Sequence, residues 1–162
     1  MIHRILPACI DNRYRGHRLG LWLFVPIAFQ KVAVSLTHLL TADGGAQSIS
    51  TIPLDTYSPS AAQNVVGLFA RMGLAQLVLA SLLVLVLARY RAMIPLMYVL
   101  IVTEYFASRV VAEVKPLLLA GTSGASTPML VIAILSATGL VLSLIGRGYA
   151  DPSAAGGGAG AH

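Results

Sequence analysis

The residues with the clearest potential for chemistry are two opposite charges within long apolar stretches, Lys31 and Glu104. Lys31 lies 13 residues beyond Arg18. Glu104 likewise lies 13 residues beyond Arg91. If both stretches are helices, each charge is ~20 Å from its arginine, at the same depth in a helical bundle. Because an unpaired charge in an apolar medium is costly, we expect Lys31 and Glu104 to approach each other or to share a polar pocket.

A second group of polar residues lies further along the same stretches. Arg71 and Arg109 are each 18 residues from a flanking arginine, or ~27 Å along a helix. His38 follows Lys31 by about two turns, and Glu113 can pair with Arg109 four residues earlier. The expected outer-leaflet polar or lipid-headgroup layer consists of His38, Arg71, Arg109, Glu113 and Lys115.

These charges allow a functional and a structural interpretation. They could form a proton or ion path, or an anionic headgroup site. We favour a structural role for Lys31 and Glu104, because no further carboxylates lead a proton away from them. We expect Arg71 and Arg109 to reach lipid phosphates. We expect a hydrogen-bonded role for His38, because a haem would call for a second, facing histidine.

Motifs that indicate catalysis or cofactor binding are missing from the sequence. No His, Cys and carboxylate cluster has metal-ligand spacing, and there is no phosphate-binding loop, nucleophile elbow or redox CxxC motif. The single cysteine excludes an intrachain disulfide. We predict a protein that is not an enzyme and has no catalytic, metal or cofactor-binding residue, and we leave open a bound lipid or quinone.

The composition predicts an all-α integral membrane protein. Of the 162 residues, 57% are hydrophobic and 10% are charged, whereas soluble domains carry about 25% charged residues. A lipid-facing surface explains this difference. The net charge is +5, but no basic and aromatic surface indicates nucleic-acid binding. Continuous apolar runs, without period-two alternation, exclude a β-barrel.

The apolar runs predict a four-helix bundle in residues 19–146. Asp43-Gly44-Gly45 and Pro53 indicate a loop over 42–58, and Ser58-Pro59 indicates a helix start. The expected membrane helices span about 19–41, 59–89, 92–115 and 128–146. We expect a cytoplasmic N-terminal segment over 1–18 and a Gly/Ala-rich cytoplasmic tail over 147–162.

The distribution of arginines predicts the orientation. One side of the expected bundle carries Arg4, Arg13, Arg15, Arg18, Arg89, Arg91 and Arg147. The opposite loops, 42–58 and 116–127, carry no arginine. The positive-inside rule therefore places both termini in the cytoplasm, an N-in/C-in topology.

One stretch resembles small uncharacterised bacterial four-helix membrane proteins of the DoxX-like kind. It runs from Pro53-Leu54-Asp55 to Arg71-Met72-Gly73-Leu74, followed by two apolar helices and Ala107-Ser108-Arg109. The resemblance covers about residues 19–145, but the paired glycines expected after the helix-two arginine are missing. It implies four helices and a bacterial inner membrane. It implies no activity, because such proteins share no established reaction.

We expect a non-enzymatic accessory, structural or assembly subunit of a larger membrane complex, such as an energy-transducing one. Its partners would be membrane lipids and other integral membrane subunits. The first helix is costly to insert alone because it contains Lys31. The fourth offers a small-residue packing face, consisting of Ala133, Ser136, Ala137 and Ser143. The alternatives are a small proton, ion or solute transporter acting as a homo-oligomer, and a quinone- or lipid-binding membrane protein.

Overall fold

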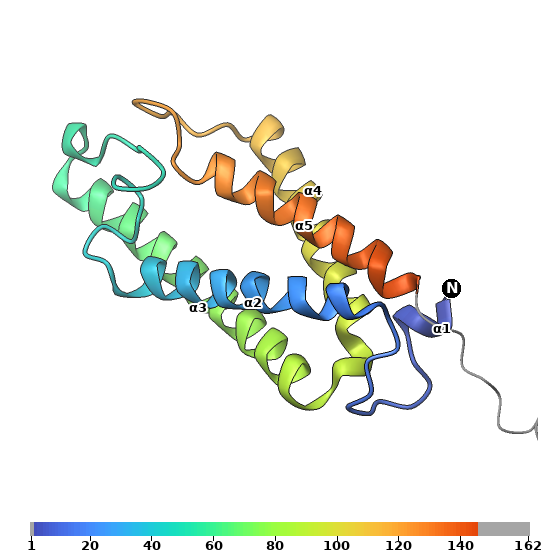
Figure 1. Cartoon of the computed structure of the whole chain (residues 1–162). Coiled ribbons are helices and arrows are strands. Elements are labelled where there is room, and N and C mark those ends of the chain that lie inside the picture. Colours follow the sequence, from blue (N-terminus) through green and yellow to red (C-terminus); the bar gives the residue numbers. More distant parts are fainter. Residues whose placement is uncertain (1, 146–162) are drawn as a thin grey trace, which may run out of the picture.

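The computed structural model describes residues 2–145, which form a bundle of four long helices (Figure 1). These helices are α2 (Arg18–Leu40), α3 (Pro59–Arg89), α4 (Ile94–Val114) and α5 (Ser126–Leu144). Short helical segments precede or join them: α1 (Ile2–Ile5), η1 (Leu54–Thr56) and η2 (Arg91–Met93). The described part of the chain contains no strand. The expected tail over 147–162, with Arg147, lies outside the described residues.

All four long helices are long and apolar enough to cross a membrane, with η2 extending α4 to Arg91–Val114. Large apolar side chains cover their outer faces, and Phe29, Leu68 and Val78 are among the most exposed. Such a surface suits lipid rather than water. The prediction of an all-α fold with four helices that are long and apolar enough to cross a membrane is confirmed.

The main hydrophobic core lies in the half of the bundle near the α3–α4 hairpin. Its buried side chains come from α2, α3 and α4 and include Phe24, Ile27, Leu83, Val86, Ile94, Met97, Tyr98 and Ile101. Tyr98 packs where a Cβ on Gly139 would lie, and its hydroxyl donates to the carbonyl of Gly20 at 2.6 Å. Glycine at these positions therefore lets α2, α4 and α5 approach closely.

The packing face of α5 differs from the expected one. Ser136, Gly139 and Ser143 are buried, whereas Ala137 is exposed. The inclusion of Ala137 was therefore wrong, and Gly139 was missed. The reason is helical geometry, because positions 136, 139 and 143 follow the i, i+3, i+7 spacing of one face and position 137 leaves it.

The N-terminal segment lies across one end of the bundle. The backbone N–H of Ala92 donates to Asp11, and that of His17 donates to Leu142. The Arg4 guanidinium donates to the carbonyl of Leu144 at 2.7 Å. These contacts gather the arginines at one end, which we call the arginine-rich end: Arg4, Arg13, Arg15, Arg18, Arg89 and Arg91. The short helix α1 at this end was not predicted.

Two connecting loops meet at the opposite end, which we call the loop end (residues 41–58 and 115–125). The Thr51 hydroxyl donates to the Gly121 carbonyl at 3.0 Å, and the Gly124 N–H donates to the Ile49 carbonyl at 2.9 Å. Apolar side chains of the first loop, including Ile52 and Leu54, pack on the first turns of α3. The first turns of α3 therefore support a folded cap rather than a free loop.

Asp43 organises the start of the first loop. Its carboxylate accepts hydrogen bonds from the N–H groups of Gly45, Gln47 and Ser48. These backbone hydrogen bonds, the one from Ser48 foremost, hold the pKa of Asp43 well below its usual range. Gly44 adopts φ 62° and Gly45 φ 74°, a region that glycine enters at little cost. The turn signal in the sequence thus corresponds to a real reversal after α2.

Candidate functional site

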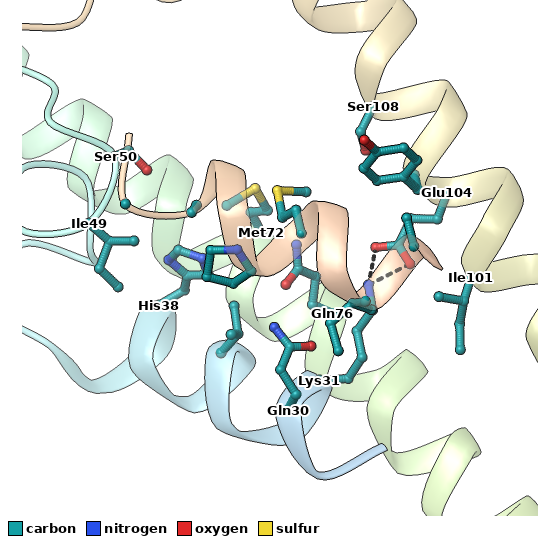
Figure 2. A pocket seen from close by; sticks show the side chains of 18 of the residues that line it. Gln30, Lys31, His38, Ile49, Ser50, Met72, Gln76, Ile101, Glu104 and Ser108 are labelled. Carbon is teal, nitrogen blue, oxygen red and sulfur yellow. Dashed lines mark hydrogen bonds and ion pairs between the residues drawn. The ribbon is translucent and has the colours of Figure 1, made fainter. Parts of the chain in front are cut away.

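A cavity of about 360 Å³ lies between α2, α3, α4 and α5, on the side of the loop end. Figure 2 shows its lining from close by. Most of the lining is apolar and includes Val34, Phe69, Met72, Ile101, Met129 and Ile132. The polar lining residues are Gln30, Lys31, His38, Ser50, Gln76, Glu104, Tyr105 and Ser108. Polar groups from three helices and one loop thus converge on a largely apolar space.

The cavity is closed toward both ends of the bundle. Ile49, Ser50 and Gly124 of the two hydrogen-bonded loops line it at the loop end. The packed core separates it from the arginine-rich end, and Ile101 belongs to both. Between these ends, α3 and α4 make few contacts with each other, and they diverge from their shared hairpin (Figure 1). The side between α3 and α4 is therefore the least packed wall.

Lys31 and Glu104 form an ion pair across this cavity. The Lys31 Nζ lies 2.7 Å from Oε1 and 2.6 Å from Oε2 of Glu104. The two side chains are 15% and 30% exposed. In Figure 2 Lys31 extends from α2 toward the Glu104 carboxylate on α4. The expected approach of these two residues is confirmed.

The ion pair is a second connection between α2 and α4, in addition to the contacts of Tyr98 with Gly20 and Phe24. α2 packs mainly on α3 and α5, and α4 packs mainly on α5. The long side chains of Lys31 and Glu104 reach across the space that these contacts leave open. Because each charge neutralises the other, the pair lowers the cost of placing both at membrane depth.

His38 is buried in the same wall of the cavity as Lys31, about two turns further along α2. Its Nδ1 lies 2.7 Å from the carbonyl oxygen of Gly44. A carbonyl only accepts, so Nδ1 carries the proton, and Nε2 of the neutral ring is an acceptor. Nε2 has no hydrogen-bond partner among the described residues. The expected hydrogen-bonded role of His38 is confirmed. The His38 and Phe69 rings also pack edge to face, with their centroids 5.7 Å apart.

The close approach of α2 and α3 at Gly73 sets the position of His38. A Cβ on Gly73 would lie 2.7 Å from the His38 Cβ and 3.0 Å from the Ser35 carbonyl. The Ser35 hydroxyl donates to the Lys31 carbonyl at 2.6 Å within its own helix. On α2, Lys31 and His38 thus line the cavity, whereas the Ser35 hydroxyl is used within its own helix.

Two glutamines in the cavity wall were missed by sequence reasoning, which concentrated on charges and histidine. Gln30 and Gln76 both line the space (Figure 2). The Oε1 of Gln30 is buried and has no hydrogen-bond partner. A buried acceptor without a donor costs about 1–3 kcal/mol. Both residues could have been noticed in the sequence as neutral amide side chains within apolar runs.

The other members of the expected outer layer point elsewhere. The exposed residues Arg71, Arg109, Glu113 and Lys115 do not line the cavity. Arg109 and Glu113 do pair along α4, at 3.7 Å, with side chains 62% and 78% exposed. The structure therefore separates His38 from these four residues, because His38 faces the α2–α3 contact and the others face outward.

The chain matches no family model, no curated protein and no solved structure in the comparisons made. The resemblance to DoxX-like proteins stays a prediction. Among the described residues, no group of three or more His, Cys, Asp or Glu side chains could hold a metal ion.

Proposed function

We propose that this protein binds a lipid-soluble amphipathic molecule, a quinone or a lipid, within the membrane. The observation that carries the proposal is the cavity of about 360 Å³, whose apolar wall contains the Lys31–Glu104 pair and His38. Small-molecule sites have this size, and they are mostly apolar with a few polar groups that orient the ligand.

The arrangement of the walls supports uptake from the bilayer. The two loops and the packed core lie at the ends of the cavity, whereas α3 and α4 contact each other little. An apolar chain that lies between α3 and α4 can stay in contact with lipid while its polar head lies near Lys31 and Glu104. The same packed core supports binding rather than passage across the membrane.

The localisation is part of this proposal. The four long apolar helices suit a multi-pass membrane protein. We place it in a bacterial inner membrane with the arginine-rich end in the cytoplasm, on the positive-inside rule.

A cavity-filling substitution tests the binding site. Ala133 lines the cavity, whereas Ala137, one turn later on α5, is exposed. We expect a short-chain alkyl hydroquinone, kept reduced, to stabilise the wild-type protein and Ala137→Phe in nanodiscs, measured as a thermal shift. Ala133→Phe should weaken this binding by about tenfold or more, which corresponds to ~1.4 kcal/mol. Equal binding by both variants, or no binding by the wild type, would contradict the proposal.

A second candidate function is that of an accessory subunit of a larger membrane complex. The observation in its favour is the outer half of α4, where every residue from 106 to 115 is exposed. A membrane helix of another subunit could cover this segment. A photoreactive side chain at Val110 should then capture one membrane protein repeatedly, whereas the same group at exposed Val84 on α3 captures lipid. Capture of lipid alone at Val110 would count against a subunit role.

A further inference from the structure

The charges that line the cavity compensate each other. Lys31 and Glu104 are joined by two contacts of 2.7 Å and 2.6 Å, and the cavity-lining residues include no other Lys, Arg, Asp or Glu. A phosphate head could bind Lys31 only in competition with Glu104, and an ammonium head could bind Glu104 only in competition with Lys31. Either exchange leaves a charge without its partner in a poorly solvated space, which is strongly unfavourable.

The cavity lining contains unused acceptors and also unused donors, among them the Tyr105 hydroxyl and the Gln76 amide. His38 donates its Nδ1 proton to Gly44, so its Nε2 has a lone pair and no proton to donate. The Oε1 of Gln30 is buried without a partner. Both atoms belong to residues that line the cavity. Of the two, only Nε2 of His38 can accept from an O–H donor in the cavity, because the Gln30 Oε1 is shielded from it.

We infer that the cavity selects amphiphiles with an uncharged hydroxyl head, that is, alcohols, phenols or hydroquinones, over those with phosphate or ammonium heads. This inference rests on the proposed binding function and specifies its ligand class. The Lys31–Glu104 pair excludes charged heads, while Nε2 of His38 accepts the hydroxyl proton. The apolar chain of the ligand lies along Met72 and Ile132 in the cavity wall.

A series of probes with one chain and different heads tests this selectivity. Tyr105 lines the cavity, so Tyr105→Trp in a Trp22→Phe background places the single tryptophan there. Dodecyl chains brominated at the end, carrying alcohol, phosphate, ammonium or methyl ether heads, then quench its fluorescence in nanodiscs. We expect half-maximal quenching by the alcohol at about tenfold lower mole fraction than by the charged probes. The ether, which cannot donate, should also be weaker.

Three substitutions in the same background should change the relative binding of the probes. Glu104→Gln leaves Lys31 without its counter-charge, so the phosphate should become the preferred probe. Lys31→Gln leaves the carboxylate unpaired, so the ammonium should become preferred. His38→Asn keeps an N–H donor for the Gly44 carbonyl but removes Nε2, and it should bring the alcohol close to the ether.

The outcomes separate this inference from the binding function on which it rests. Equal quenching of the parent protein by alcohol and phosphate, or by alcohol and ammonium, overturns the selectivity while the site remains a binding site. An unchanged order in both Glu104→Gln and Lys31→Gln overturns the role of the ion pair. Quenching by no probe in any variant overturns the proposed function as well.

Discussion

Lys31 and Glu104 show how a partly buried ion pair is used at membrane depth. Their side chains are 15% and 30% exposed, so desolvation is incomplete and the full cost of a buried ion is not incurred. A buried pair contributes little net stability compared with apolar side chains, but loss of one partner leaves an uncompensated charge. We therefore expect the pair to contribute little net stability, although loss of either partner alone should be costly.

A double-mutant cycle on Lys31 and Glu104 compares the loss of one charge with the loss of both, as changes in the free energy of unfolding. Lys31→Met and Glu104→Leu should each destabilise the protein, by about 1–3 kcal/mol, below the range for fully buried pairs because the site is partly open. The double variant should be nearly as stable as the wild type. The measurement is reversible unfolding in mixed micelles, followed by far-ultraviolet circular dichroism.

The exposed pair Arg109–Glu113 on α4 provides the control for this cycle. Its groups are 3.7 Å apart and mostly exposed, so Arg109→Met and Glu113→Leu should change stability by less than about 1 kcal/mol each. If both pairs gave equal losses, burial would not be the cause of the effect at Lys31 and Glu104.

Residue-level prediction succeeded where a fixed helical rise was sufficient. Counting from Arg18 and Arg91 placed Lys31 and Glu104 at one depth, because every helical residue advances the chain by ~1.5 Å. The same count could not assign the Gly44 carbonyl to His38, because that partner depends on how the loop folds back after α2. Nor could it tell which neutral amides, such as Gln30, face the cavity.

At the scale of elements, close helix contact at Gly73 positions one wall of the cavity. A Cβ there would meet the backbone of α2 at Leu39 and Ser35 at 3.0 Å, so neither helix can relieve the contact by rotating a side chain. By contrast, a Cβ on Gly67, two turns earlier on α3, would meet nothing within 4 Å. The two glycines of α3 thus have different reasons to be present.

Alanine at these two positions should have opposite effects. Gly73→Ala separates α2 from α3 and should destabilise the protein by about 1–3 kcal/mol. Gly67→Ala should be neutral or stabilising by up to about 1 kcal/mol, because alanine favours helix more than glycine does. Thermal melting of both variants in one detergent measures the difference. Equal melting temperatures would show that α2 and α3 do not pack as closely as described.

The elements themselves were largely predictable, because their signals are local. Ser58 accepts a hydrogen bond from the Ala61 N–H and Pro59 opens α3, as the dipeptide indicated. The hydrogen bonds between the two loops were not predictable, because residues near Thr51 and Gly121 are distant in sequence and carry no paired motif. The cavity depends on those loops and on the divergence of α3 and α4, so it could not be predicted from the sequence either.

At the scale of the whole molecule, the two ends of the helical bundle are held together by different contacts. The arginine-rich end is tied together by backbone hydrogen bonds from the N-terminal segment to η2 and α5. The loop end is closed by loop-to-loop contacts and borders the cavity. The sequence predicted that the arginines lie at one end, and the cytoplasmic location of that end, inferred from the positive-inside rule, stays a prediction.

Thiol labelling tests the membrane topology that follows from this asymmetry. Cys9 is exposed, belongs to the N-terminal segment, and is the sole cysteine of the chain. In a Cys9→Ser background, Ser60→Cys places one thiol in the first turn of α3, next to the first loop, and Thr122→Cys places one in the second loop; both residues are exposed. In intact spheroplasts, a membrane-impermeant maleimide should label the cysteines at 60 and 122. It should label Cys9 of the wild type only after permeabilisation.

Labelling of Cys9 alone in intact spheroplasts would show that the orientation is the reverse of the predicted one. Labelling at only one of positions 60 and 122 would show that α3 and α4 do not both cross the membrane. Because α2 alone separates Cys9 from residue 60, these two positions test whether α2 spans the bilayer, whereas residues 60 and 122 test whether α3 and α4 cross it together or not.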